Sequence, residues 1–279
     1  MAGTPLDLDT LPVGRRIWLG NWLILKREPH QLAYLHRTHG QPSATDSDYN
    51  RISIPSGDGT WLVVLPDGSK IGLSPGSSLS FAVYPAEVLP HARLALLDGE
   101  AIVQVAHNDH IPFYLESAKC KIKVQGTVFS IRDYSNEKTS TVLQYSDSLE
   151  ITNGWKYLTL HTDEQATITR KDPAIHIARE NKLTPPDILK PESFDFSHST
   201  LDSAFRQLAN WYGIARVSID HDLHSDTLKK LGLGHISKDL SLSQLIEQLQ
   251  KTTNTMHFSA DEDMLSVSKQ TSSGPDQTR

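Results

Sequence analysis

Two short polar groups carry residue types that bind metal ions in proteins: His107, Asp109 and His110, and His221, Asp222 and His224. A zinc site needs three or four such ligands converging in space, and helical zinc motifs place two histidines four residues apart. Neither group has a cysteine partner or that helical spacing. A solvated polar loop accounts for the same residues. We therefore predict no metal site and no other cofactor.

Nucleophilic and acid–base chemistry have one candidate each. Cys120 is the only cysteine, so it has no partner for an internal disulfide, and it lies in a strand-like segment. A cysteine nucleophile needs a lowered thiol pKa and a nearby base, and no local motif supplies either. Asp98 and Glu100 would serve as paired carboxylates only if one carboxyl pKa were raised. The simpler interpretation is that Asp98 makes a turn and Glu100 begins the next strand.

Other catalytic signatures are missing from the sequence. It has no glycine-rich phosphate loop, no nucleophile elbow and no arrangement of serine, histidine and aspartate typical of hydrolases. We interpret Cys120 as a small core residue, expect no catalytic residue, and predict that the protein is not an enzyme.

The elements that would position these side chains are mostly strands. Residues 15–169 consist of short runs with alternating apolar residues, separated by turn sequences and without helical periodicity. This pattern is typical of an all-β sandwich, barrel or solenoid. Pro66-Asp67-Gly68 and Leu97-Asp98-Gly99 are turn sequences, because Asp bonds to the backbone two residues on and Gly accepts a positive φ. We predict a tight reversal between strands at each.

The run KVQGTVFSI, residues 123–131, changes register in its middle. Its apolar residues lie at even positions up to Val128 and at odd positions from Phe129 onward. Side chains of a strand alternate between two faces, so something shifts the register near Gly126 and Thr127. A glycine in a strand pattern is typical of a bulge or sharp bend. We interpret the stretch as a corner of the scaffold and not as a ligand-binding turn.

A proline- and charge-rich segment, residues 171–192, separates this region from one of different pattern. Its composition is typical of a linker. The order after it is strand, helix, strand and then strand, helix, hairpin. Such units pack their helices against a small sheet, so residues 193–269 predict an α+β domain. The last residues, 270–279, are expected to be disordered.

Two segments have apolar residues at the three- and four-residue spacing of a helix, and their expected first and last capping residues are Ser199 with Gly213, and Ser241 with Asn254. Trp211 and Tyr212, in the first of them, form a candidate aromatic binding surface. The helical spacing from Leu208 places one of the two in the core, and we favour Trp211 for that position.

Composition excludes one class of partner. The chain of 279 residues has 27 basic and 33 acidic residues, a formal net charge of −6, with both signs scattered along it. We therefore predict no nucleic-acid partner. The apolar stretch from Ile17 to Leu25 is shorter than the roughly twenty residues of a membrane-spanning helix. We expect this chain as given to be soluble, and to be cut from a longer, membrane-anchored protein.

Three sequence blocks, in this order, resemble the FecR family of anti-sigma factors. The first contains LPDGS and leads to SSL, the second contains LLDGEA followed by IPF, and the third is VQGTVFSI. We expect structural roles for the residues that carry the resemblance: Pro66, Asp67, Gly68, Gly99, Glu100, Pro112, Phe113, Gly126, Thr127 and Phe129.

The C-terminal region resembles the signalling domain of secretins and TonB-dependent transporters. FDFSHSTL and SLSQLIEQL are similar to the paired halves of that domain. Two segments depart from the FecR pattern: Leu73-Ser74-Pro75 where the family has Leu-Asn, and Tyr145-Ser146-Asp147 where it has a leucine and a glycine. Both replacements preserve turn character, so they affect loop details.

The resemblance implies a fold that is mainly β with a C-terminal α+β domain. Extra strands, partly flexible, are expected in residues 1–47, and an elongated, antiparallel or solenoid-like FecR domain in 48–170. The linker, 171–192, then leads to a two-helix, small-sheet domain of βαβ-βαββ order in 193–269 and to the tail, 270–279.

The resemblance also implies a function. The chain is then the periplasmic part of a single-pass inner-membrane protein of a Gram-negative bacterium. Its expected partners are the signalling domain of a TonB-dependent outer-membrane transporter and, through a cytoplasmic segment absent from this chain, an extracytoplasmic-function sigma factor. Strand edges of either domain, or the helical face of the second, are candidate contacts.

One alternative comes from a different class, a carbohydrate- or ligand-binding β module without enzymatic activity. Such a module needs an exposed aromatic platform or a concave polar pocket. Burial of all four of its candidate tryptophans would argue against it: Trp18, Trp22, Trp61 and Trp155.

Overall fold

The chain divides into two compact units, the first made of residues 1–54 and 59–190 and the second of residues 55–58 and 191–279. The computed structural model describes residues 6–8, 10–19, 22–36, 49–82, 93–185, 193–196, 199–223, 235–238, 240–253, 255–261 and 263–269.

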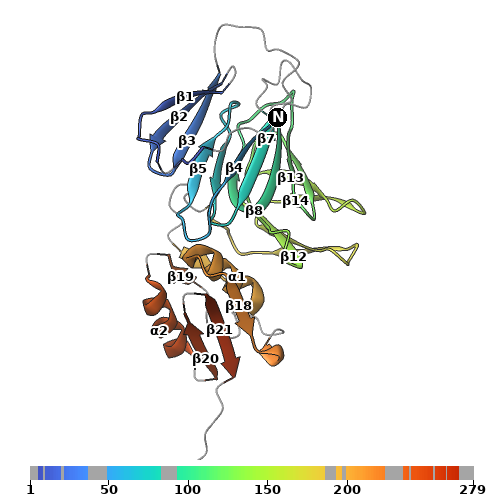
Figure 1. Ribbon diagram of the computed structural model, residues 1–279. Coiled ribbons are helices and arrows are strands. Elements are labelled where there is room, and N and C mark those ends of the chain that lie inside the picture. The colour runs from blue at the N-terminus through green and yellow to red at the C-terminus, as the bar shows by residue number, and fades with distance from the viewer. Residues whose placement is uncertain are drawn as a thin grey trace, which may run out of the picture. The chain divides into compact units, whose positions relative to one another are not determined.

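The described part of the first unit consists of strands and their connections (Figure 1). The strands are β1 (Arg16–Leu19), β2 (Trp22–Glu28), β3 (Gln31–His36), β4 (Tyr49–Ser53), β5 (Trp61–Val64), β6 (Lys70–Leu73), β7 (Ser78–Ala82), β8 (Leu94–Gln104), β9 (Phe113–Glu116), β10 (Lys121–Val124), β11 (Val128–Asp133), β12 (Thr139–Gln144), β13 (Ser148–Thr152), β14 (Tyr157–His161), β15 (Glu164–Thr169) and β16 (Ile175–Arg179).

Two sheets share the long strand β8. One follows the order β1-β2-β3-β5-β6-β8-β11-β12-β15-β16, and the other joins β4, β7, β9, β10, β13 and β14 to the first half of β8. Side chains from both sheets form one buried cluster whose largest members include Trp61, Phe81, Phe113 and Phe129. The strand path described is open, so the predicted β-rich fold is confirmed without a closed barrel.

The reversal predicted at Leu97-Asp98-Gly99 is wrong, because Leu94–Gln104 is one continuous strand. Ala95 to Asp98 pair with β7, whereas Gly99 to Gln104 pair with β11, so β8 passes between the sheets at this point. Gly99 has a φ of 133°, and a Cβ on it would lie 2.3 Å from Ser77 Oγ. Gly99 therefore marks the point where the chain changes sheet. A turn and this crossing both require backbone angles that residues other than glycine resist, so the sequence pattern of the two is the same.

Pro66-Asp67-Gly68 does form the predicted turn, between β5 and β6. The Ser69 backbone N–H donates to Asp67 Oδ1 at 2.9 Å, the expected bond to the backbone two residues on. Gly68 has a φ of 85°, which glycine adopts without strain.

The register change in KVQGTVFSI is also a change of sheet. β10 ends at Val124 and pairs with β9 and β13, whereas β11 begins at Val128 and pairs with β8 and β12. Gly126 and Thr127 lie in the connection between these strands. The expected scaffold corner is confirmed, although it joins two strands and is not a bulge within one.

The second unit contains both helices (Figure 1). Its elements are β17 (Ser193–Asp195), α1 (Leu201–Tyr212), β18 (Arg216–Ile219), the short 3-10 helix His221–Leu223, β19 (His235–Ser237), α2 (Leu242–Thr252), β20 (Met256–Ala260) and β21 (Met264–Lys269). The predicted element order is confirmed. β18, β21 and β20 form one sheet, and β17 pairs with β19. Within the described residues, neither helix is long and apolar enough to cross a membrane.

The helix ends largely follow local capping chemistry. α1 begins one residue later than predicted, because Thr200 is the N-cap and its Oγ1 accepts from the Ser203 N–H at 3.2 Å. Gly213 ends α1 as predicted, with a φ of 73°. Ser241 caps α2 as predicted and shares a reciprocal capping box with Gln244. Asn254, the expected end of α2, lies outside the described residues.

Part of the segment interpreted as a linker forms a strand. Ile175–Arg179 is β16, which pairs with β15 along its whole length. Ile175 alone is buried in β16, and the other four residues are exposed, so the apolar signal for this strand is weak. The expected disordered tail, 270–279, lies outside the described residues.

Candidate functional site

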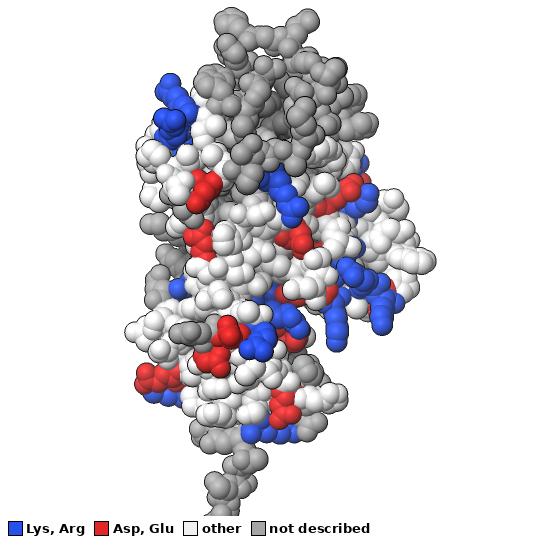
Figure 2. Space-filling model, in the orientation of Figure 1, with Lys and Arg blue, Asp and Glu red and all other residues white. Residues whose placement is uncertain are grey.

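Surface charge in this molecule is mixed. On the face shown in Figure 2, acidic and basic side chains of the described residues are interspersed, and no large area of one sign is visible. The exposed pairs Lys121 with Glu116 and Lys123 with Glu150 join opposite charges at 2.9 and 3.1 Å. This face therefore has no basic stripe of the kind that binds nucleic acid.

The turn residue Asp67 anchors a buried arginine of the first unit. Arg93 Nε donates to Asp67 Oδ2 at 3.0 Å, and the same guanidinium donates to the carbonyl oxygens of Ile111 and Ala106. It also lies over the Phe113 ring, 5.7 Å from the ring centroid. Pro112, half-buried, precedes that ring at the start of β9. The family residues at this point therefore join the β5–β6 turn to the beginnings of β8 and β9.

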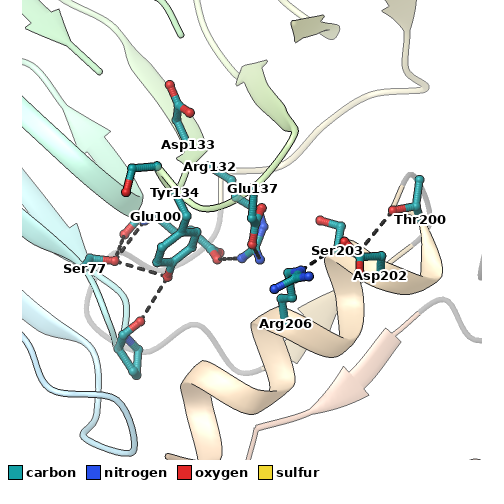
Figure 3. A network of polar contacts seen from close by, with 12 residues as sticks. Ser77, Glu100, Arg132, Asp133, Tyr134, Glu137, Thr200, Asp202, Ser203 and Arg206 are labelled. Carbon is teal, nitrogen blue, oxygen red and sulfur yellow. Dashed lines mark hydrogen bonds and ion pairs between the residues drawn. The ribbon is translucent and has the colours of Figure 1, made fainter. Parts of the chain in front are cut away.

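A second polar network surrounds Glu100 (Figure 3). Arg132 donates to Glu100 Oε2 at 2.7 Å and also to the carboxylate of Glu137. Burial by itself would lower the pKa of Arg132, but the Glu137 and Glu100 carboxylates raise it, so the guanidinium stays charged. Tyr134 Oη donates to the Pro75 carbonyl at 3.0 Å, and burial raises its pKa to about 12.

Asp98 and Glu100 have separate hydrogen-bond partners. Asp98 accepts from the Ser135 N–H at 2.8 Å and from Ser135 Oγ at 3.0 Å. Glu100 is bound by Arg132, and its own N–H donates to Ser77 Oγ at 2.9 Å. The two carboxylates thus bind different partners, Asp98 the loop residue Ser135 and Glu100 the β11 residue Arg132.

A fully buried ion pair closes the next corner. Lys119 and Asp133 side chains have 1% and 0% exposure, and Lys119 Nζ binds the Asp133 carboxylate. The second carboxylate oxygen accepts from the Lys119 N–H at 2.8 Å, and Nζ also donates to the Tyr134 carbonyl at 2.8 Å. With both charges compensated and no solvent access, this pair is a structural joint between the β9–β10 turn and the end of β11.

The Gly126-Thr127 corner is fixed by close packing and hydrogen bonds. A Cβ at Gly126 would lie 2.6 Å from the Cα of His107, so only glycine fits there. Gln144 Nε2 donates to Thr127 Oγ1 at 2.6 Å, and Thr127 Oγ1 donates to the Ser146 carbonyl. Phe129, the last of the family residues, is fully buried two residues further on.

The environment of Cys120 disfavours its thiolate form. Its side chain is buried, and burial raises its thiol pKa to about 12. A thiolate is the reactive form, so this environment suppresses reactivity. The interpretation of Cys120 as a core residue agrees with its place in the apolar cluster.

The two candidate metal groups do not assemble in the part of the chain that the structure describes. His107 Nε2 lies 3.0 Å from Asp109 Oδ1, with both side chains more than half exposed. No set of three possible ligands gathers among the described residues, and His224 lies outside them.

Aromatic residues of the first unit differ sharply in exposure. Trp61 is 1% exposed, whereas Trp155 and Tyr157, at the tip of the β13–β14 hairpin, are 78% and 79% exposed. The side chains of Trp18 and Trp22 lie outside the described part. Trp211 and Tyr212 are both half-buried against the core of the second unit, so the helical spacing does not place one inside and the other outside.

Strand edges remain as candidate partner-binding sites. Strands that pair with a single described neighbour include β14 and β16 in the first unit and β18 and β20 in the second. An edge strand presents unpaired N–H and C=O groups on which another chain can add a strand. On β14 the side chain of Glu164 already occupies one such group, since it accepts from the His161 N–H at 2.9 Å.

Comparison with known proteins gives a family match for part of the first unit. Residues 53–145 match the model of the FecR protein family, which confirms the predicted resemblance. Two crystal structures of a "putative anti-sigma factor" from Parabacteroides distasonis match the fold with a TM-score of 0.68 each, at 20% and 19% sequence identity. Both alignments cover 80% of this chain and all of the other. A comparison with curated proteins gives no match.

Proposed function

We propose that this chain, with its FecR match at residues 53–145, is the periplasmic sensor part of a membrane-anchored anti-sigma factor. The sensor binds the N-terminal signalling domain of a TonB-dependent outer-membrane transporter. It passes the state of that transporter to an extracytoplasmic-function sigma factor, through a cytoplasmic segment outside this chain.

The family match is the observation that carries the proposal, and the nature of the polar clusters supports it. Buried ionised groups of the first unit form ion pairs with one another at two corners, Lys119 with Asp133 and Arg132 with Glu100. The only cysteine has a raised thiol pKa. These features suit a rigid scaffold for protein recognition better than an active site, and the FecR family suggests a regulatory role.

Binding to the transporter domain is the direct test. The full 279-residue chain is titrated by calorimetry with the purified signalling domain of the transporter encoded beside its gene. We expect saturable binding with one site per chain. The signalling domain of an unrelated transporter serves as the control. Absence of binding to any signalling domain would refute the proposal for this chain.

A second candidate function rests on the exposed pair Trp155 and Tyr157. Two neighbouring aromatic side chains, each more than three-quarters exposed, can stack on a sugar ring. A carbohydrate-binding module predicts quenching of tryptophan fluorescence by oligosaccharides, which is lost in Trp155→Ala and kept in Trp211→Phe. No quenching in the wild-type protein would exclude this candidate.

A further inference from the structure

The two edges of the three-stranded sheet in the second unit differ in whether a side chain binds the outward backbone groups of the edge strand. At the β20 edge, the side chain of Gln250 from α2 lies along the strand. Its Nε2 donates to the Met256 carbonyl at 2.9 Å, and its Oε1 accepts from the Phe258 N–H at 3.0 Å. One carboxamide thus supplies the donor and the acceptor that an added strand would supply, and it closes this edge.

The β18 edge has no such cover among the described residues. In the parallel pairing of β18 with β21, the N–H groups of Arg216 and Asp220 donate to β21-side carbonyls at 2.9 and 3.0 Å. Residues of a strand alternate in the direction of their backbone groups. The N–H and C=O groups of Val217 and Ile219 therefore point away from β21, toward the open side.

The two faces of β18 also differ in the side chains that they carry. Val217 and Ile219 are half-buried against the apolar cluster of the second unit, whereas Arg216 and Ser218 are exposed on the other face. Among the described residues, the apolar cluster is therefore incompletely covered along this edge. An extended segment placed beside β18 would satisfy the two residues' backbone groups and cover the flank of the core with its own apolar side chains.

We infer that the β18 edge receives an extended strand of the partner's signalling domain, which continues the β20-β21-β18 sheet by one strand. This inference rests on the proposed function and names the surface that performs it. The chemistry of the edge defines the segment. It carries apolar side chains at alternate positions on the face of Val217 and Ile219, and polar ones on the face of Arg216 and Ser218.

The open edges of the first unit fit this role less well. Ile175 is the only buried residue of β16 and its other four residues are exposed, so a strand added beside β16 would cover little of the apolar core. On β14 the Glu164 carboxylate already occupies the His161 N–H. β18 combines an apolar flank with a backbone edge that no side chain of the described residues caps.

Amide hydrogen exchange on the full chain, with and without the signalling domain of the neighbouring transporter, tests the inference directly. We expect the Val217 and Ile219 amides to exchange at least about tenfold more slowly in the complex, because they gain hydrogen bonds. The Phe258 amide is the internal control, since Gln250 binds it in both states. If the wild-type chain binds the domain but exchange at Val217 and Ile219 is unchanged, the inference is wrong while the proposed function stands.

Substitutions give a second, independent readout. Val217→Pro removes the outward N–H, and an edge position tolerates proline, so we expect affinity to fall by about tenfold or more. Val217→Thr keeps both the N–H and the branched shape and is the matched control, with affinity within about threefold of wild type. Circular dichroism verifies that both variants fold. If Val217→Pro fails to fold, the exchange experiment decides alone.

Two further variants separate β18 from its competitors. Gln250→Ala opens the β20 edge, and we expect it to leave partner affinity unchanged. Trp155→Ala with Tyr157→Ala removes the exposed aromatic pair and is expected to have no effect either. Loss of binding in the aromatic variant, with Val217→Pro unaffected, would transfer the interface to the first unit and overturn the inference. No binding by the wild-type chain would refute the proposed function and this inference together.

Discussion

The two units stabilise their folds by different means. All the buried charged side chains identified in the described residues belong to the first unit: Lys26, Arg93, Lys119, Arg132, Asp133 and Glu137. The second unit has an apolar core of phenylalanine, leucine and other aliphatic side chains, and its described ion pairs lie at the surface. A strand unit whose chain crosses repeatedly between two sheets uses buried polar contacts at its corners, whereas the helical unit uses capped helices on a small sheet.

The largest expected difference between the units comes from breaking a buried pair. Asp133→Ala leaves Lys119 buried at 1% exposure without its carboxylate, so we expect the free energy of unfolding of the first unit to fall by about 3–5 kcal/mol. Glu247→Ala in the second unit breaks an exposed pair with Lys251 and is expected to cause no resolvable change. Urea unfolding monitored by circular dichroism measures both. Equal losses would remove the distinction between the units.

Glycine substitutions sharpen the role of corners within the first unit. Gly99→Ala places a Cβ 2.3 Å from Ser77 Oγ at a φ of 133°, and we expect a loss of about 2–4 kcal/mol. Gly154→Ala is the matched control, because its φ of 86° is also positive but no atom lies within 4 Å of the added Cβ. There we expect about 1 kcal/mol from the backbone alone. Similar losses in the two variants would show that the sheet crossing is not tightly packed.

Capping in the second unit predicts a smaller effect. Thr200→Ala removes the acceptor of the Ser203 N–H and is expected to cost about 1 kcal/mol in the stability of that unit. Ser199→Ala, one residue earlier, tests the assignment of the cap and is expected to change little. Thermal unfolding followed by the helical circular dichroism signal provides the measurement. A larger loss of stability in Ser199→Ala than in Thr200→Ala would identify Ser199, the residue predicted from the sequence, as the N-cap of α1.

The smallest effect at neutral pH concerns Cys120. Its thiol has a pKa of about 12 in the folded chain against a reference value of 9.0, so above pH 9 the unfolded chain releases a proton that the folded chain keeps. Stability is therefore unaffected below pH 9 and falls as the pH rises toward 12. Unfolding titrations at pH 8 and pH 10.5 measure the decline, which we expect to be smaller in Cys120→Ala. An identical decline in that variant would assign it to other groups, such as Tyr134, whose pKa is also about 12.

Local signals predicted well where the chemistry is local. Ser241 and Gln244 are three residues apart and form a capping box, and Asp67 binds the backbone two residues on. Gly213 ends its helix in the left-handed conformation that glycine favours. In each case the residues that interact lie within a few positions of one another, so the local sequence contains both hydrogen-bond partners.

Contacts between distant segments were missed. Asp98-Gly99 has the composition of a hairpin turn, but the partners that make it a sheet crossing are Ser77 and Ser135, far along the chain. Lys119 lies in the β9–β10 turn and Asp133 at the end of β11, and nothing in their spacing of 14 residues signals a buried pair. A glycine in the sequence thus indicates a backbone conformation that other residues resist. Only the residues around it in space decide whether that conformation forms a turn or a crossing between sheets.

The sequence by itself determined the resemblance of residues 53–145 to FecR proteins, the β-rich first region, the element order of the second unit and the locations of its two helices. Periodicity and turn chemistry are local properties, so they survive without the fold. The tertiary structure decided which glycines turn and which cross between sheets, which charges are buried in pairs, and which strand edges are closed. Those outcomes depend on hydrogen-bond partners and packing from remote segments. Gln250 binds the backbone of β20, whereas β18 has only β21 as a neighbour among the described strands.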